Sequence, residues 1–385
     1  MKKIFLTTIT LLSMASASVF GMYGVDTDWI FFLTHGNQFR ARLDQLGFTL
    51  GNDTIKGTFG FDNNTGFGGA YGGLLVDNDG THYSFVPSIS MGLGYTSSLI
   101  SVGVGYNATI GDHTQKFNGK TEPKTVNKSA HTPVLVLNAM DNAFRMAIPI
   151  QVYVDNDKFD GGGYDNKMAV SVDSQFRYYT GLDALPQVRL YLRYGLYQNE
   201  SKATKDAEKV KTKYGESFGF DFRLYFGSMV EEVALQPLVR LAYDGALGNY
   251  HANTRIQAVK AMDGAYSTVS YGGGVWNLKL MTGLGLTANS DIVSLYLEPQ
   301  LGLKVTRRGS SSSAGVGPDG TPTAASIARD SFNLAYNVYA EIYITPLKNL
   351  DWYFEAQLGS DLPVGGSLGF GFNGTTGITW YLPAL

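Results

Sequence analysis

The sequence contains no cysteine, only 12 prolines and little charge, with 16% Asp, Glu, Lys and Arg against a usual figure of about 25%. The absence of cysteine excludes disulfides, thiolate metal sites and a lipidated N-terminal cysteine. It is compatible with a location in the cell envelope. The formal net charge of −3 gives no electrostatic reason to expect a nucleic-acid partner.

Long apolar runs are missing except at the N-terminus. There, two lysines and an apolar run in Lys2–Met14 are followed by small residues up to Gly21. This order predicts a secretory signal peptide over residues 1–21, cleaved after Gly21, with cleavage after Ala17 as the alternative. The longest uninterrupted apolar run beyond it is Trp29–Leu33, far shorter than the about 20 residues of a transmembrane helix. An exported chain of this kind is either soluble or a β-barrel.

The sequence is rich instead in glycine (47 residues) and in aromatic residues (13%), which suits long strands joined by tight turns. In the stretch Gln187–Tyr197, Val188 and Leu190 alternate with Arg189 and Arg193. A period of two puts the apolar and the polar residues on opposite faces of a strand. About 11 residues at roughly 3.3 Å each and a tilt of about 45° cross about 25 Å, the height of the apolar band of an outer-membrane barrel.

The same alternation recurs along the chain and predicts about 16 strands, with about 14 or 12 as alternatives. The expected strands are Phe39–Leu50, Thr54–Phe61, Phe67–Val76, Tyr83–Tyr95, Leu99–Ile110, Thr132–Met140, Ala143–Val154, Met168–Tyr179, Gln187–Tyr197, Tyr214–Phe226, Val233–Tyr243, Thr268–Leu286, Ile292–Val305, Phe332–Ile344, Leu350–Leu358 and Leu368–Leu382. In residues 39–95 the alternation is imperfect, so the sequence leaves the strand boundaries and the strand number there open.

The connections between these strands alternate in length. The short ones are Thr96–Ser98, Asp141-Asn142, Gly181–Leu185, Gly227–Glu231, Thr287–Asp291 and Thr345–Asn349, and the long polar ones are Gly111–His131, Asp155–Asn166, Asn199–Lys213, Asp244–Ser267 and Thr306–Asp330. Outer-membrane barrels have short periplasmic turns and long extracellular loops. We therefore expect an all-β fold, a transmembrane antiparallel up-and-down β-barrel over residues 22–385, with a periplasmic N-terminal segment at 22–38. A soluble sandwich is disfavoured, because the second face of each strand is too polar for a second core.

Aromatic residues near the predicted strand ends indicate two interfacial girdles. The periplasmic girdle is expected to contain Tyr178, Phe226, Tyr343, Trp352, Trp380 and Tyr381, and the outer girdle Tyr153, Tyr194, Tyr197, Tyr214 and Tyr243.

Charged residues lie on the strand face opposite the apolar residues, so they are expected to face the lumen. The basic candidates are Arg177, Arg189, Arg193, Arg223, Arg240 and Lys304, and the acidic candidates are Glu298, Glu341, Asp351 and Glu355. Two interpretations stay open: opposed charges that bias solute passage, or ion pairs that stiffen the wall.

By analogy of fold with porins, the connection Gly111–His131 is a candidate constriction loop through Lys116, Lys120 and Lys124. A solvated outer loop is the alternative. The connection Asn199–Lys213, which is rich in lysine, is predicted to be an exposed flexible loop.

Catalysis is not indicated. The five histidines form no i, i+4 pair for a metal, and the sequence contains no G-x-S-x-G motif. We expect no enzyme activity, no catalytic residue, no metal and no cofactor; a barrel-borne hydrolase is the least favoured function.

The segments Met22–Asp26 (M-Y-G-V-D) and Phe39–Phe48 (F-R-A-R-L-D-Q-L-G-F) resemble the variable surface proteins of intestinal spirochaetes. The resemblance implies a surface-exposed, antigenically variable outer-membrane protein whose loops differ between paralogues. It implies no enzyme activity and transfers no functional residue. In one respect the chain differs from commoner barrels, since it ends in Tyr381–Leu385 and not on an aromatic residue.

From this we expect porin-like passive diffusion of small hydrophilic solutes, with a closed-lumen surface adhesin or structural antigen as the alternative. The expected partners are outer-membrane lipid, the barrel assembly machinery, further copies or paralogues in an oligomer, and host antibodies or surface ligands, but no nucleic acid.

Overall fold

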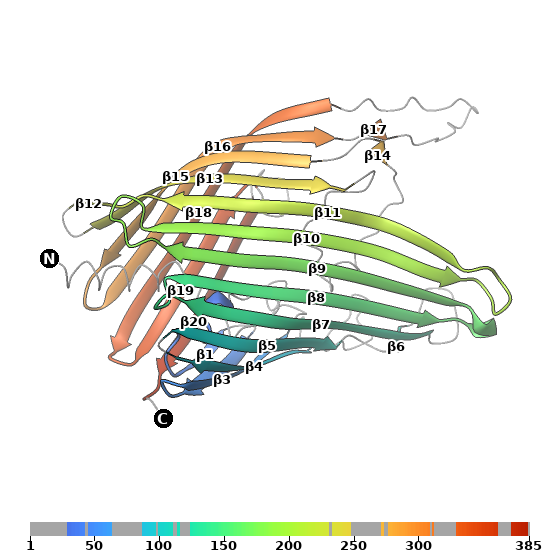
Figure 1. Cartoon of the computed structure of the whole chain (residues 1–385), viewed down its shortest axis with the longest axis horizontal. Coiled ribbons are helices and arrows are strands. Elements are labelled where there is room, and N and C mark those ends of the chain that lie inside the picture. The colour runs from blue at the N-terminus through green and yellow to red at the C-terminus, as the bar shows by residue number, and fades with distance from the viewer. Residues whose placement is uncertain are drawn as a thin grey trace.

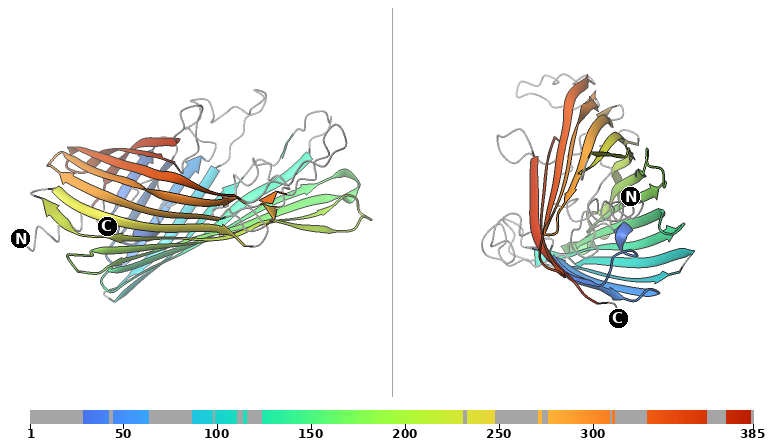
Figure 2. Two further views of the ribbon diagram at one scale, coloured as in Figure 1. Left: turned by 90° about the horizontal axis from the view of Figure 1, so that it is seen from above. Right: turned by 90° about the vertical axis from the view of Figure 1, so that its left-hand side faces the viewer.

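The computed structural model describes residues 29–42, 45–63, 87–97, 99–110, 114–115, 124–230, 233–247, 271–272, 276–308, 310–311, 329–360 and 371–383. Within them, sixteen strands form one closed antiparallel ring, in which each strand pairs with its sequence neighbours and β20 pairs with β1 (Figures 1 and 2). The predicted up-and-down β-barrel and its strand number are confirmed. Among the described residues there is no helix with the length and apolarity that crossing a membrane requires.

The strands of the ring are β1 (Gln38–Arg42), β2 (Gln45–Gly51), β3 (Ile55–Asn63), β4 (Pro87–Thr96), β5 (Ile100–Ile110), β7 (Lys124–Ala139), β8 (Phe144–Lys158), β9 (Tyr164–Tyr179), β10 (Gln187–Lys202), β11 (Val210–Tyr225), β13 (Val233–Ala246), β15 (Trp276–Asn289), β16 (Val293–Arg308), β18 (Arg329–Leu347), β19 (Leu350–Gly359) and β20 (Gly371–Tyr381). Two short strands, β6 (Thr114–Gln115) and β12 (Ser228–Val230), pair with β7 and β13, and β14 (Tyr271–Gly272) pairs with β17 (Ser310–Ser311). Two single turns of 3-10 helix complete the described elements, η1 (Trp29–Phe31) and η2 (Asp160–Gly162).

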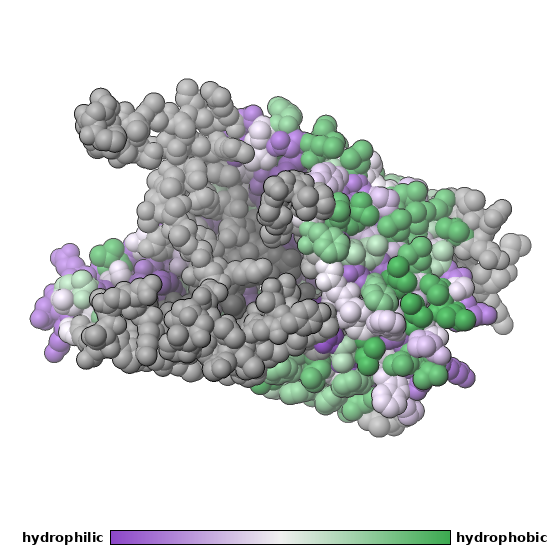
Figure 3. Space-filling model, turned by 180° about the vertical axis from the view of Figure 1, so that it is seen from behind, coloured by the Kyte–Doolittle hydropathy of each residue, from purple (hydrophilic) through white to green (hydrophobic). Residues whose placement is uncertain are grey.

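The period of two decides which side chains face out. On β16, Leu301 and Leu303 are 57% and 61% exposed, whereas Glu298 and Gln300 are 5% and 4% exposed. Apolar residues gather in this way over the outer wall towards the short-turn end of the barrel (Figure 3). An apolar outer face with a polar inner face is the arrangement that lipid outside requires, and the closed ring leaves no strand edge unpaired in the membrane.

The first strand differs from the prediction. Phe39–Leu50 was expected to be one strand, but β1 and β2 form a hairpin in which Ala41 lies opposite Leu46. The signal was present in the sequence, because the apolar residues change parity between Ala41 and Leu46. The predicted strand Phe67–Val76 lies outside the described residues, so the predicted and observed strand sets agree in number but not in membership.

The predicted long connections are in part strand. β8, β9, β10 and β11 contain 15, 16, 16 and 16 residues and leave only 159–163 and 203–209 as connections. At roughly 3.3 Å per residue these strands reach beyond an apolar band of about 25 Å, even when tilted. The expectation of a flexible loop at Asn199–Lys213 was wrong, since Glu200 pairs with Lys211 in the extended β10–β11 hairpin. The apolar alternation stops where the strands leave the membrane, whereas their backbone pairing continues.

The aromatic girdles are only partly as predicted. Tyr178, Phe226, Trp352 and Trp380 are 37–51% exposed at the short-turn end and face outward. Four other members face inward, as their parity with buried neighbours shows: Tyr343, Tyr381, Tyr153 and Tyr197. Their positions near strand ends suggested a girdle, but their parity places them in the barrel interior.

This topology predicts which connections are at the cell surface. An epitope inserted after Lys205, in the 203–209 connection, is expected to bind antibody on intact cells, because β10 and β11 extend beyond the membrane there. The same epitope inserted after Asp141, between β7 and β8, is expected to bind only after permeabilisation. Labelling of the Asp141 insertion on intact cells would contradict the orientation.

Candidate functional site in the barrel interior

The structure places all the charged residues predicted to line the lumen on the inner face of the ring. Arg177, Arg189, Glu298 and Glu341 are 1–5% exposed. The remaining ones, Arg193, Arg223, Arg240, Lys304, Asp351 and Glu355, are half-buried on the same parity. Of the candidate constriction residues, Lys116 and Lys120 lie outside the described residues. Lys124 is the first residue of β7 and pairs with Gln115, so at this point the backbone extends the wall.

Five arginines form one row around the inner wall. The strand register places Arg145, Arg177, Arg189, Arg223 and Arg240 directly opposite one another on β8, β9, β10, β11 and β13. Like charges in directly opposed positions destabilise a sheet unless other groups compensate them. Arg145 was not among the predicted lumen residues. It lies between Phe144 and Met146, which were predicted to share one face, so its opposite parity already indicated the inner face.

Asp221 neutralises one end of this row. Its side chain is fully buried and accepts hydrogen bonds from Nε and Nη2 of Arg223 at 3.0 and 2.8 Å, and from Nε and Nη2 of Arg240 at 3.1 and 2.7 Å. Arg193 on the next row pairs with Asp173 at 3.2 Å and with Asp244 at 4.0 Å. Three of the predicted lumen arginines therefore take part in ion pairs within the wall, as one of the two interpretations proposed.

The acidic residues lie on the neighbouring part of the wall and accept from hydroxyl groups. Tyr339 and Tyr343 donate to the carboxylate of Glu341. Tyr381 and Thr345 donate to Asp351, each at 2.8 Å. Tyr296 and Gln300 donate to the two oxygens of Glu298. The predicted arginines on β9–β13 and the predicted acidic residues on β16–β19 thus occupy two adjacent arcs, and Lys304 on β16 lies in the acidic one.

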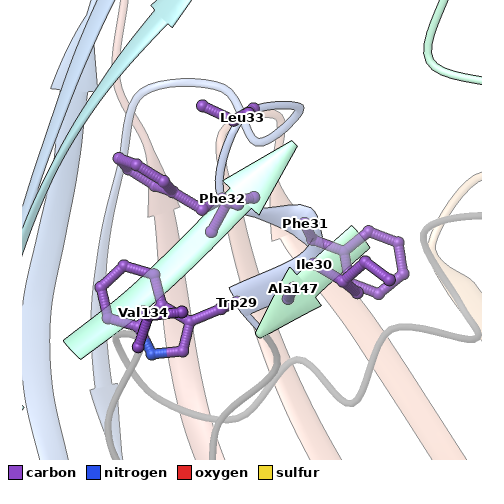
Figure 4. Packing of buried hydrophobic residues seen from close by; sticks show 8 residues of the cluster. Trp29, Ile30, Phe31, Phe32, Leu33, Val134 and Ala147 are labelled. Atoms are coloured by element: carbon purple, nitrogen blue, oxygen red, sulfur yellow. The ribbon is translucent and has the colours of Figure 1, made fainter. Parts of the chain in front are cut away.

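The interior also contains a short apolar segment, Trp29–Leu33, which we call the inner segment. Its five side chains are 0–3% exposed and pack against Val134 of β7 and Ala147 of β8 (Figure 4). Val136 of β7 belongs to the same cluster, and Tyr343 of β18 packs against it. Seven strands of the ring separate β7 from β18 on one side (β8, β9, β10, β11, β13, β15, β16) and seven on the other (β19, β20, β1, β2, β3, β4, β5). The inner segment therefore reaches from one wall of the barrel to the opposite wall. It precedes β1 and lies inside the ring, not below it, contrary to a wholly periplasmic segment at 22–38.

Glycines on two strands make room for this segment. Gly92 and Gly94 on β4 and Gly103 and Gly105 on β5 alternate with outward apolar residues, so they face the lumen. A Cβ at Gly92 would lie 2.9 Å from the Trp29 ring, and one at Gly105 would overlap that ring. A Cβ at Gly94 would overlap Leu33, and one at Gly103 would lie 3.1 Å from it. The wall is hollowed on the inside where the segment packs.

The basic row supports the other side of the segment. The guanidinium of Arg177 lies 4.4 Å from the centre of the Phe31 ring, and that of Arg145 lies 5.5 Å from it. Lys56 Nζ donates to the Leu33 carbonyl at 2.9 Å. Burial of an apolar side chain contributes roughly 1.5–3 kcal/mol and each cation–π contact about 0.5–2 kcal/mol, so docking of the segment is strongly favoured.

The sequence did contain a signal for the inner segment. Trp29–Leu33 is the longest uninterrupted apolar run after the predicted signal peptide, and it lies outside the strand pattern. The repeated glycines at 92, 94, 103 and 105 leave an otherwise polar face without side chains. Neither signal indicates by itself that the two features meet, because they are separated by about 60–75 residues and joined only by closure of the ring.

A profile of the Serpulina hyodysenteriae variable surface protein family matches residues 2–381. The chain belongs to this family. No curated protein matches the sequence of this variable surface protein. Among solved structures, the translocator domain of the autotransporter NalP from Neisseria meningitidis is similar at 14% identity and a TM-score of 0.31, over 74% of this chain and 90% of that one. Family and fold together indicate a surface protein of the outer membrane.

Substitution of Asp221 tests the importance of the ion-pair network in this variable surface protein. Asp221→Asn is expected to lower the free energy of unfolding by about 3–5 kcal/mol, because it leaves two arginines without their buried counter-charge. Urea unfolding of the protein in lipid vesicles measures the effect. Asp206→Asn, in the exposed β10–β11 connection, removes the same charge and is expected to change little. Equal effects of the two substitutions would contradict a central role for Asp221.

Acid is expected to weaken docking of the inner segment through His35. Burial, and then the positive charges of Arg40, Lys56 and Arg145 on β1, β3 and β8, lower the pKa of His35 well below its usual value of 6.5. The docked state therefore favours neutral His35, whereas an undocked segment takes up a proton as the pH falls below about 6.5. Docking is thus at full strength above that pH and weakens below it.

The absence of cysteine makes this measurable. A thiol at the fully buried Ile30 (Ile30→Cys) is expected to react faster with a maleimide at pH 5.5 than at pH 7.5, after correction by the exposed thiol of Asp141→Cys. His35→Gln in the Ile30→Cys protein is expected to abolish the difference. A difference of the same size without His35 would assign the pH dependence to another group.

Proposed function

We propose that this protein is a surface-exposed outer-membrane barrel with porin-like permeability to small hydrophilic solutes, limited by the inner segment. A ring of sixteen strands is wide enough to leave an aqueous passage unless something fills it. The observation that carries the proposal is that a short piece of chain, held by packing, crosses the lumen between β7 and β18. On β4 and β5, where Trp29 and Leu33 dock, the wall presents glycine.

The inner segment is a removable obstruction in physical terms. It precedes the first strand, so its departure breaks no strand pairing of the ring. Its contacts are apolar burial, cation–π contacts and a few hydrogen bonds, all of which reform when it returns. Behind it, the inner wall carries hydroxyls, carboxylates and guanidinium groups, which favour water and polar solutes over apolar ones.

If the inner segment never leaves the lumen, its contacts with the wall keep the barrel closed. The protein is then a closed-lumen surface antigen, which is the alternative function. The two functions differ in a single measurable property, conduction of ions across a bilayer. They share the location and the fold, so both are compatible with the family.

Planar-bilayer recordings of the purified protein test the proposal. Gly94→Ala and Gly105→Ala put a Cβ into Leu33 or Trp29, which costs about 1–3 kcal/mol of docking free energy, so openings are expected to become roughly 5- to 150-fold more frequent than in the unmodified protein. Gly57→Ala is the matched control on the neighbouring β3, since a Cβ there meets nothing closer than 3.9 Å. It is expected to behave as the unmodified protein.

Absence of conductance in the unmodified protein and in both glycine variants, with folding verified by heat-modifiable migration, would sink the porin-like function and favour the closed-lumen antigen. Equal conductance in all four proteins would show instead that the inner segment does not limit the passage.

A further inference from the structure

A row of buried hydrogen-bond donors lies at the short-turn end of β9, β10 and β11. The register places Gln187 directly between Tyr179 and Tyr225 on the inner face. Gln187 is 5% exposed and Tyr225 is fully buried. Among the described residues, the amide Nε2 of Gln187 and the hydroxyls of Tyr179 and Tyr225 have no hydrogen-bond partner. Buried polar atoms without partners are rare in folded proteins, and several side by side mark a place where an ordered water, an ion or a polar ligand is held.

The orientation of the Gln187 amide is fixed by its neighbour. Its Oε1 accepts from Nε and Nη2 of Arg189 at 3.0 and 2.8 Å, which leaves Nε2 as the group without a partner. Arg189 itself lies over the ring of Tyr225, with 4.4 Å between the guanidinium carbon and the ring centre. Gln187 and Tyr225 therefore both contact the Arg189 guanidinium, whereas the centre of the Tyr179 ring lies 4.9 Å from the guanidinium carbon of Arg145.

The adjacent row adds positive charge. Arg145, Arg177 and Arg189 lie side by side, next to Arg223 and Arg240, which pair with Asp221. Glu298 is the carboxylate that acts electrostatically on Arg189, but its two oxygens already accept from Tyr296 and Gln300. Near Gln187 and Tyr225 the described wall thus presents the Arg189 guanidinium together with two donors that have no partner, Gln187 Nε2 and the Tyr225 hydroxyl.

We propose that these two rows bind a small oxyanion, such as phosphate or the carboxylate of an organic acid, which enters from the short-turn mouth. An oxyanion carries several acceptor oxygens and a negative charge, and guanidinium groups pair with such oxygens strongly. Phe31 of the inner segment covers Arg177, so the site opens fully when the segment leaves. The inference adds a solute class to the proposed permeability and rests on that function only for access through the lumen.

Removal of one hydroxyl separates a binding role from a structural one. Because the Tyr225 hydroxyl has no partner in the described structure, Tyr225→Phe is expected to fold normally and to keep the contact with Arg189. Titration calorimetry with inorganic phosphate, at constant ionic strength in detergent, is expected to show roughly tenfold weaker binding to Tyr225→Phe, the loss of one hydrogen bond to a charged group. Arg189→Gln is expected to abolish binding.

The titrations are made in the unmodified chain and in Gly105→Ala, where the inner segment is loosened. Arg307→Gln, at the exposed outer end of β16, removes the same charge as Arg189→Gln and is expected to leave phosphate binding unchanged. A parallel titration with acetate tells phosphate from a carboxylate as the preferred ligand.

Two results would overturn the site: no binding of either anion to Gly105→Ala, or equal losses in Arg189→Gln and Arg307→Gln. Unchanged phosphate binding in Tyr225→Phe would contradict a role of the Tyr225 hydroxyl in the site. None of these measurements requires a conducting channel, so anion binding and the proposed permeability are tested independently.

Discussion

The interior of the protein depends on one constraint, the width of a ring of sixteen antiparallel strands. A ring of this size is too wide to be filled by the inward side chains of its own strands, and charges buried in its wall need counter-charges. The chain meets these requirements in two ways. On β4 and β5 the wall is reduced to glycine and the inner segment fills the space, whereas on β9, β10, β11 and β13 arginines and carboxylates compensate one another.

The inner segment and the row of arginines are in contact at Phe31. Five arginines in directly opposed positions would repel one another in an otherwise neutral wall. Asp221 compensates Arg223 and Arg240, and the rings of Tyr225 and Phe31 offer their negative faces to Arg189 and Arg177. The apolar inner segment therefore stabilises the basic row, and the basic row holds the segment. Loosening one is expected to change the electrostatics of the other, which links access to the lumen with its charge.

The period of two in the sequence predicted which residues face the interior and that the strands form a closed ring. Contacts between segments distant in the sequence could not be predicted in this way. The parity of Arg189, Arg223 and Glu341 placed them in the interior, and the alternating connections predicted the closed ring. The extended β10–β11 hairpin was missed because its outer residues, such as Glu200 and Lys211, are polar on both faces. The docking of Trp29 against Gly92 and Gly105 was also missed, because it depends on which strands the ring brings together.

The inner and outer halves of the barrel also differ in how they are stabilised. Glu200 pairs with Lys209 and Lys211 at the outer end of β10, where water screens the charges and the pairs contribute little to stability. Asp221, in contrast, is fully buried between two arginines, so substitution there leaves uncompensated charge inside the wall. Stability is concentrated in the short-turn half of the barrel, around the inner segment and Asp221. The outer hairpins are held mainly by backbone pairing, which is indifferent to side-chain identity, so their exposed side chains are free to change.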